Sequence, residues 1–131
     1  MKKILRFYFR RVRRRVRRKP LSSKKYLEQK EDARKLVLDR LGYWNKHYNY
    51  KYSRVSIRNQ RSRWGSCSSK GNLNFNFRIV TLPPHLSDYI IVHELCHLGQ
   101  MNHSQKFWDL VGRTLPNYEE LMLELRKVRM T

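Results

Sequence analysis

The chain has 131 residues and carries 30 Lys or Arg against 10 Asp or Glu, which gives a formal net charge of +20 at pH 7. This length suits one domain with one modest core, and 2 cysteines are too few for a disulfide framework. No apolar run is long enough to span a membrane, and the N-terminus lacks the apolar stretch and cleavage site of a secretory signal. We therefore expect a monomeric, soluble protein of a reducing cytoplasm.

The first 20 residues form a basic head, with 11 Lys or Arg and no acid. Ile4, Tyr8, Val12 and Val16 recur every four residues, so a helix here would carry an apolar stripe between arginines. Such a helix could contact nucleic acid, lie on an anionic membrane surface or dock on the domain itself. Because Pro20 ends this segment, we predict that the domain proper covers 21–131. The candidate nucleic-acid contacts in the head are Arg10, Arg11, Arg13, Arg14, Arg15, Arg17 and Arg18.

The first half of the domain combines a helical pattern with two alternating patterns. Apolar residues near helical spacing predict a long helix over 24–47. Alternation around Val55 and Ile57 predicts a half-buried strand, and alternation over 72–78 predicts another. The turn Lys70-Gly71-Asn72 predicts a hairpin that joins the second of these strands to a strand within 63–69.

The second half of the domain is predicted to be helical. One helix begins at Pro83 or Pro84, because proline suits a first helical turn. Another runs from a Ser104 cap to about Leu115, and a last helix spans about 118–129. The pattern as a whole predicts an α+β domain in which a short antiparallel sheet packs on helices.

A second basic region lies between Asp39 and Asp88, an interval without any acid. Basic residues such as Lys51 and Arg54 are interleaved there with aromatic residues such as Tyr52. Phosphate attraction and base stacking would suit nucleic acid. Aromatic residues in a core beneath a solvated, charged face would give the same composition. The sequence leaves both interpretations open.

The run from His93 to His97, His-Glu-Leu-Cys-His, carries the clearest chemistry in the chain. Residues four apart on a helix lie about 40° apart around its axis, so the two imidazoles point the same way, one turn apart. This is the geometry in which two histidines bind one zinc ion. Glu94 lies beside the first ligand, where its carboxylate can reach a zinc-bound water and act as general base. The spacing predicts a zinc-dependent hydrolase, most simply a peptidase.

A third metal ligand must come from outside this helical turn. His103 follows His97 by six residues and is the leading candidate, because Gly99 permits the chain to turn back towards the metal. The alternative is Glu119 or Glu120, contributed by a helix further along the chain.

Five motifs stand in order between Arg63 and Tyr118, within a longer stretch of about residues 28–128. They are Arg63-Trp64-Gly65-Ser66-Cys67-Ser68, Asn72-Leu73-Asn74-Phe75-Asn76, the run from Asp88 to His97, Asn102-His103-Ser104 with Phe107-Trp108, and Pro116 with Tyr118. Together they closely resemble the YgjP-like metallopeptidases, which are relatives of the SprT-like and WLM zinc proteases. The resemblance implies a zincin-like domain that holds one zinc ion through its three histidines and uses the glutamate as base.

The resemblance also implies how substrate is bound. In zincins an edge strand pairs with the substrate backbone beside the metal, and here that strand is expected in the 72–79 arm. Asn74, Phe75 and Asn76 are then the candidate substrate contacts, unless the two asparagines are simply the polar side of a strand. Tyr118 is the candidate oxyanion stabiliser.

The remaining reactive side chains are expected to pack or to support the site. Cys96 is rotated away from the ligand pair on the helix, so we expect it to be buried, with Cys67 only a minor alternative as a zinc ligand. The other expectations are Trp64 in the core, His47 and His85 as surface or packing residues, and Asp109 or Glu119 hydrogen-bonded to ligand imidazoles.

Three functional hypotheses follow from these observations. The first is a zinc endopeptidase that acts on unfolded or flexible protein segments. The second is the same chemistry directed to proteins on nucleic acid, with the basic head as tether. The third is a basic binding protein whose zinc is structural, and Glu94 argues against it because a closed four-ligand site needs no base.

Overall fold

The structure is a computed structural model in which residues 23–130 are described. The basic head, with its seven candidate arginine contacts from Arg10 to Arg18, lies outside the described residues. Within the described part of the chain, no helix is both long and apolar enough to cross a membrane.

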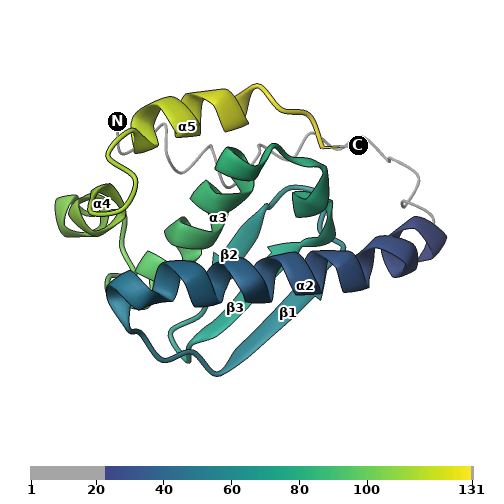
Figure 1. The fold of residues 1–131 in the computed structure, drawn as a ribbon, viewed down its shortest axis with the longest axis horizontal. Coiled ribbons are helices and arrows are strands. Elements are labelled where there is room, and N and C mark those ends of the chain that lie inside the picture. Colours follow the sequence, from purple (N-terminus) through teal and green to yellow (C-terminus); the bar gives the residue numbers. More distant parts are fainter. Residues whose placement is uncertain (1–22, 131) are drawn as a thin grey trace.

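The long helix α2 covers Ser23–Tyr48 and confirms the helix predicted for 24–47. Ala33, Val37 and Leu41 follow one another at intervals of four residues and are all fully buried. This stripe places one face of α2 against the interior, so that α2 lies across the sheet in Figure 1. Most charged side chains of the helix are exposed, whereas Arg34 and Arg40 bond to Val55 of β1 and to Asp88.

A three-stranded sheet forms from β1 (Arg54–Arg58), β2 (Gly65–Cys67) and β3 (Asn72–Asn76), in the order β1-β3-β2. The predicted hairpin is confirmed: β2 and β3 pair antiparallel, and Gly71 adopts a φ of +82° in the turn between them. The prediction of an all-antiparallel sheet is wrong, because β1 pairs parallel to β3. The chain reverses once between β1 and β2 and again in the hairpin, so β3 runs in the direction of β1.

The strand predicted over 72–78 ends earlier, at Asn76. Residues Phe77–Thr81 form the 3-10 helix η1, and the Asn76 side chain caps it by accepting a hydrogen bond of 3.1 Å from the Arg78 backbone N–H. Phe77 and Ile79 are fully buried, as they would be in a strand with an apolar face. The apolar side chains therefore stay buried beyond Asn76, although the backbone changes there from a strand to a 3-10 helix.

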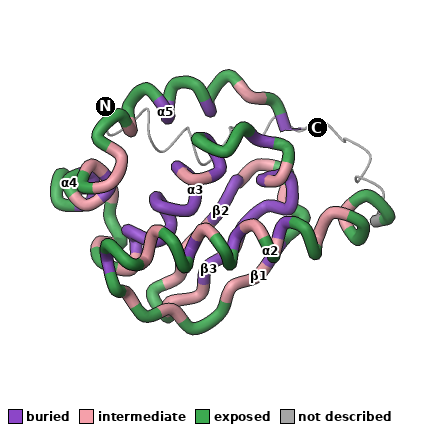
Figure 2. The backbone as a smooth tube through the Cα atoms, in the orientation of Figure 1, coloured by how far each residue is buried: buried purple, intermediate pink, exposed green. Residues whose placement is uncertain are grey.

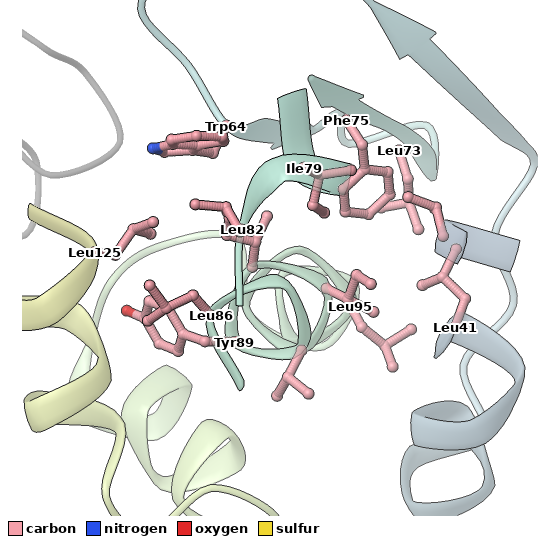
Figure 3. Close-up of a cluster of buried hydrophobic side chains, with 14 of the residues drawn as sticks. Leu41, Trp64, Leu73, Phe75, Ile79, Leu82, Leu86, Tyr89, Leu95 and Leu125 are labelled. Atoms are coloured by element: carbon pink, nitrogen blue, oxygen red, sulfur yellow. The ribbon is translucent and has the colours of Figure 1, made fainter. Parts of the chain in front are cut away.

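Helix α3 (Pro84–Cys96) runs through the middle of the molecule, between α5 and the layer formed by α2 and the sheet (Figure 1). It is buried along most of its length, as the purple tube in Figure 2 shows. Figure 3 shows its core contacts, with Leu41 reaching in from α2, Phe75 from β3 and Leu125 from α5. Trp64 and Cys96 are buried in this core, as predicted.

Helices α4 (Gln105–Gly112) and α5 (Tyr118–Arg126) complete the fold, each about three residues shorter at its C-terminus than the sequence pattern suggested. Helices and a small sheet around one core confirm the predicted α+β class. The fold places the last turn of α3 beside β2, and the two elements meet at the candidate site.

Candidate metal centre

Three imidazoles converge at the C-terminal end of α3. His93 lies in the last turns of the helix and His97 is its C-terminal cap, so that the two side chains stand one turn apart. His103 reaches the same point from the loop before α4. The Nε2 atoms of His93 and His97 lie 3.1 Å apart, and each lies 3.2 Å from Nε2 of His103.

This donor set fits a zinc ion. Zinc binds imidazole nitrogen at about 2.0–2.1 Å, so two ligands at a tetrahedral angle lie about 3.3–3.4 Å apart, close to the observed separations. The Gln100 carbonyl accepts a hydrogen bond of 3.0 Å from Nδ1 of His97, which leaves Nε2 of that ring with its lone pair for a metal. Among the described residues, the only group of metal-ligating side chains is His93, His97 and His103.

Burial keeps these rings in the neutral form that binds metal. The buried position of His93, next to the other two rings, lowers its pKa well below the usual range for histidine. Burial likewise lowers the pKa of His97. Neutral imidazoles can bind a cation without first losing a proton, so the metal-free site is prepared for it.

Aromatic side chains of α4 hold two of the ligand rings in place. Phe107 stacks on His97 with ring centroids 4.3 Å apart, and Trp108 stacks on His103 at 6.0 Å. Tyr118 in turn stacks on Trp108 at 5.0 Å. Sequence reasoning used these aromatic residues only as family motifs and missed their contacts, because the contacts depend on how α4 packs against α3.

Glu94 lies beside the three histidines and is 2% exposed. Burial raises the pKa of its carboxyl group to about 8, against the opposing influence of the Arg63 charge. Gly65 of β2 makes room for it: a Cβ on Gly65 would lie 3.0 Å from Cγ and 3.1 Å from Oε2 of Glu94. The glycine in this motif thus allows a strand to approach a buried carboxylate closely.

A cavity of about 210 Å³ connects these groups with solvent. The helical side contributes the three histidines and Glu94, and the opposite side is formed by β2 and the residue two places before it. The lining residues are Arg63, Gly65, Ser66, Cys67, His93, Glu94, His97, Met101 and His103. An open cavity at the metal-binding atoms gives a substrate access to them, as a catalytic metal site requires.

The loop between the second and third histidines is fixed from α2. Gly99 lies so close to Tyr50 that a Cβ would come within 2.8 Å of Cζ of that ring. Asn45 holds Tyr50 by accepting from its backbone N–H at 2.9 Å and donating to its carbonyl at 2.8 Å. Tyr50 also stacks on Tyr48, whose hydroxyl donates to the Leu110 carbonyl of α4 at 2.6 Å.

The candidate substrate contacts lie elsewhere, and the expectation of an edge strand in the 72–79 arm is wrong. Strand β3 is central, with β1 on one side and β2 on the other, so it has no open edge. Phe75 is fully buried in the core, and Asn76 is fully buried and bonds to backbone carbonyls. The amide of Asn74 donates to the Ser66 hydroxyl at 3.2 Å. None of the three lines the cavity.

The remaining candidates are placed as follows. Glu119 and Glu120 are exposed and do not belong to the metal-ligating group, and neither does Cys67, although it lines the cavity. Asp109 accepts a hydrogen bond from Gln105 at 2.8 Å. Tyr118 is not among the cavity residues, and its role as oxyanion stabiliser stays a prediction. His47 and His85 are exposed, as expected.

Three converging histidines and a buried glutamate on an open cavity define the class of a metal-dependent hydrolase. The model of the YgjP-like metallopeptidase domain family matches residues 7–128, and the chain belongs to this family. It is a metallopeptidase, an enzyme that hydrolyses peptide bonds and requires a metal. The family predicted from the sequence motifs is confirmed.

Two solved structures are similar to this chain. The metallopeptidase zymogen abylysin of Pyrococcus abyssi is 26% identical, with a TM-score of 0.61 over 72% of this chain and 99% of that one. The metallopeptidase zymogen jannalysin of Methanocaldococcus jannaschii is 24% identical and shares the fold, with a TM-score of 0.59 over 68% of this chain and 92% of that one. No curated protein matches the chain.

Proposed function

We propose that this metallopeptidase is a zinc endopeptidase that cleaves flexible or unfolded protein segments, with Glu94 as general base. One zinc ion is held by His93, His97 and His103. The observation that carries the proposal is the position of the Glu94 carboxylate, which is buried and lines the same cavity as the three ligand histidines. A closed structural site would have neither this carboxylate nor an open side.

When bound, zinc supplies a Lewis acid that polarises a peptide carbonyl and lowers the pKa of water to about 7. Glu94 accepts a proton from the attacking water at a carboxylate oxygen. It then donates this proton to the amine nitrogen as the carbon–nitrogen bond breaks. Burial raises the pKa of this carboxyl group in the metal-free protein, and the charge of a bound zinc ion would lower it again towards the ionised form that accepts the proton.

The strand that borders the cavity is β2, so we assign substrate pairing to β2 in place of the 72–79 arm. Gly65, Ser66 and Cys67 all line the cavity, and β3 occupies only one edge of β2. The other edge can pair with an extended peptide through backbone hydrogen bonds. This mode of binding tolerates many sequences and requires a segment that is not folded.

The test compares zinc-loaded wild type with Glu94→Gln on an unfolded protein substrate, with the zinc content of both preparations measured. We expect cleavage by the wild type and a loss of about 10²–10⁴-fold in the variant at unchanged zinc content. Cleavage by the variant at the wild-type rate would exclude Glu94 as the base. Absence of cleavage by the zinc-loaded wild type would contradict the endopeptidase proposal.

A second proposal is that nucleic acid binds the same protein and brings the enzyme to protein substrates. Its support is the charge distribution: residues 40–87 contain no acid, and Lys51, Arg54, Arg58 and Lys70 are exposed there. Binding to single-stranded DNA should weaken as salt rises and should weaken further when residues 1–20 are deleted. Binding that is unchanged by the deletion would contradict the tether.

A further inference from the structure

We infer that Arg63 is a specificity-determining residue that binds a substrate carboxylate, so that the enzyme prefers acidic peptides. The inference rests on the proposed function, because it assigns a substrate class to the same cavity. It concerns the side of the cavity formed by β2 and Arg63, to which metal binding and the general base assign no role for a charged side chain.

Arg63 is the one Lys or Arg among the described residues that line the cavity. It is half-buried, and its guanidinium has no hydrogen-bond or ion-pair partner within residues 23–130. Glu94 is the one acid in the cavity, and Arg63 acts on it through its charge without a hydrogen bond. The five N–H donors of Arg63 therefore remain available to a ligand in the cavity.

Other arginines of the domain show what a structural arginine does in this molecule. Arg40 of α2 forms a two-pronged pair with Asp88, at 2.8 and 3.0 Å. Arg78 is buried and donates to the Gln60 carbonyl at 2.8 Å and to Asn76 at 3.2 Å. Arg63 has the same fork of donors, but it lines the cavity and no group within residues 23–130 accepts from it.

The backbone that carries Arg63 is held firmly although its side chain is not. The fully buried Asn76 donates through its amide to the Arg63 carbonyl at 2.8 Å and to the Gln60 carbonyl at 2.7 Å. The next residue, Trp64, is buried in the core and its carbonyl accepts from the Asn76 backbone N–H at 2.8 Å. A fixed backbone beneath an unpaired charged group is the arrangement of a prepared binding site.

The chemistry of the group points to a carboxylate. A guanidinium matches the two oxygens of a carboxylate with two parallel hydrogen bonds, and a partly desolvated site strengthens such a pair. The surrounding field has the same sign, because residues 40–87 contain no acid and the chain carries +20 overall. Acidic substrates are attracted to such a cavity before they contact it.

The carboxylate can belong to a Glu or Asp side chain or to the C-terminus of the substrate. A peptide with Glu near the scissile bond is therefore compared with the same peptide carrying Gln. Each is made with a free and with an amidated C-terminus. Side-chain recognition predicts that the Glu/Gln difference persists in the amidated pair, whereas recognition of the terminus predicts that amidation removes the preference.

Binding is measured first, by fluorescence anisotropy with zinc-loaded protein that carries Glu94→Gln, in which cleavage is expected to be about 10²–10⁴-fold slower. We expect the carboxylate peptide to bind about tenfold or more tightly than its uncharged match. In Arg63→Met this preference should disappear, and in Arg63→Lys it should be partly retained. Arg61→Met removes the same charge from an exposed position outside the cavity and should keep the preference.

Cleavage of the same peptides is measured next, with enzyme that retains Glu94. The wild type should show the same preference in kcat/KM, and Arg63→Met should lose it at unchanged zinc content and melting temperature. If the wild type cleaves nothing while binding remains selective and dependent on Arg63, the proposed function fails and the inference stands. Equal binding of the paired peptides by wild type would overturn the inference. The inference would also be overturned if Arg61→Met lost the peptide preference as fully as Arg63→Met. The same holds if Arg63→Met lost oligonucleotide binding and kept the peptide preference.

Discussion

The two sides of the cavity are built in opposite ways. On the helical side, the imidazoles of His93, His97 and His103 are packed among Phe107 and Trp108. On the strand side, β2 presents small side chains and a backbone edge, and Arg63 presents donors that have no partner in the described part of the chain. One side is rigid in its side chains, and the other is fixed in its backbone alone.

This difference matches two different tasks. A metal site needs its donor atoms within a fraction of an ångström of their positions, so each ring is held by contacts behind it. A site for many peptides must bind what they share, which is the backbone, and must leave room for the side chains that vary. Changes to the three histidines or to the groups packed behind them should therefore act on metal binding, and changes on the strand side should act on the base and the substrate.

Removing a ligand on the helical side should have the largest effect. His103→Ala takes one of three converging nitrogen atoms from the site, so zinc affinity should fall by more than the 10–100-fold expected for loss of a group behind a ligand. Peptidase activity should be lost with it. Titration with a competing chelator measures the affinity. His85→Ala is the control, since that exposed ring only pairs with Glu124 at 2.8 Å; equal zinc affinity in both variants would contradict the site.

The next prediction concerns the pH dependence of stability in the metal-free protein. Burial raises the pKa of Glu94 to about 8, so the folded state resists ionisation of this carboxyl group. Below the unfolded pKa near 4.3 the group is neutral in both states and costs nothing. Between that value and about 8 the unfolded state ionises while the folded state stays protonated, so the folded state loses stability relative to a neutral side chain; above about 8 the loss levels off.

Glu94→Gln should therefore stabilise the metal-free protein by an amount that grows from pH 5 to about pH 8, reaches a few kcal/mol and then stays level. Urea unfolding in the presence of a chelator measures the difference at each pH. A constant difference across this range would show that Glu94 is not desolvated. With zinc added, the same substitution should leave metal binding intact, which separates the base from the ligands on the helical side.

Local sequence patterns predicted the helical side well. The repeat of α3 alone brings His93 and His97 together, and the spacing to His103 is short enough for one loop. The hairpin was equally local, because Gly71 adopts the positive φ that its turn requires. In both cases the residues that decide the geometry are neighbours along the chain.

The strand side could not be predicted in this way. Alternation in β3 is the same for a central and for an edge strand, and it is the crossing between Arg58 and Gly65 that leaves β3 in the middle. The donors of Arg63 lack a partner among the described residues because no acid from another described element pairs with them. Contacts of this kind depend on the whole fold, and the alternation of Asn74, Phe75 and Asn76 alone does not reveal that their strand lies in the middle of the sheet.

On the strand side, Gly65→Ala should separate the base from the metal. Its Cβ would meet Glu94 Cγ at 3.0 Å and the Asn74 carbonyl at 3.1 Å, so the strand or the carboxylate must shift. We expect a loss of about 1–3 kcal/mol in unfolding free energy and about 10²-fold in kcat, with zinc affinity unchanged. Gly42→Ala, where a Cβ meets nothing within 4 Å on the exposed face of α2, should instead stabilise by about 0.5–1 kcal/mol.

The smallest effect is expected at Gly99, in the loop that joins His97 to His103. A Cβ on Gly99 would meet Tyr50 Cζ at 2.8 Å and Leu110 Cδ1 at 3.1 Å, and the ligand loop must move to relieve both contacts. Because this loop carries the Gln100 carbonyl that orients His97, Gly99→Ala should weaken zinc binding by about tenfold. Gly112→Ala is the control, since its Cβ meets only ordinary contacts to Tyr118 at 3.5 Å and beyond. If Gly99→Ala instead lowers kcat at unchanged zinc affinity, this loop acts on the substrate, and the assignment of the loop to metal binding would be wrong.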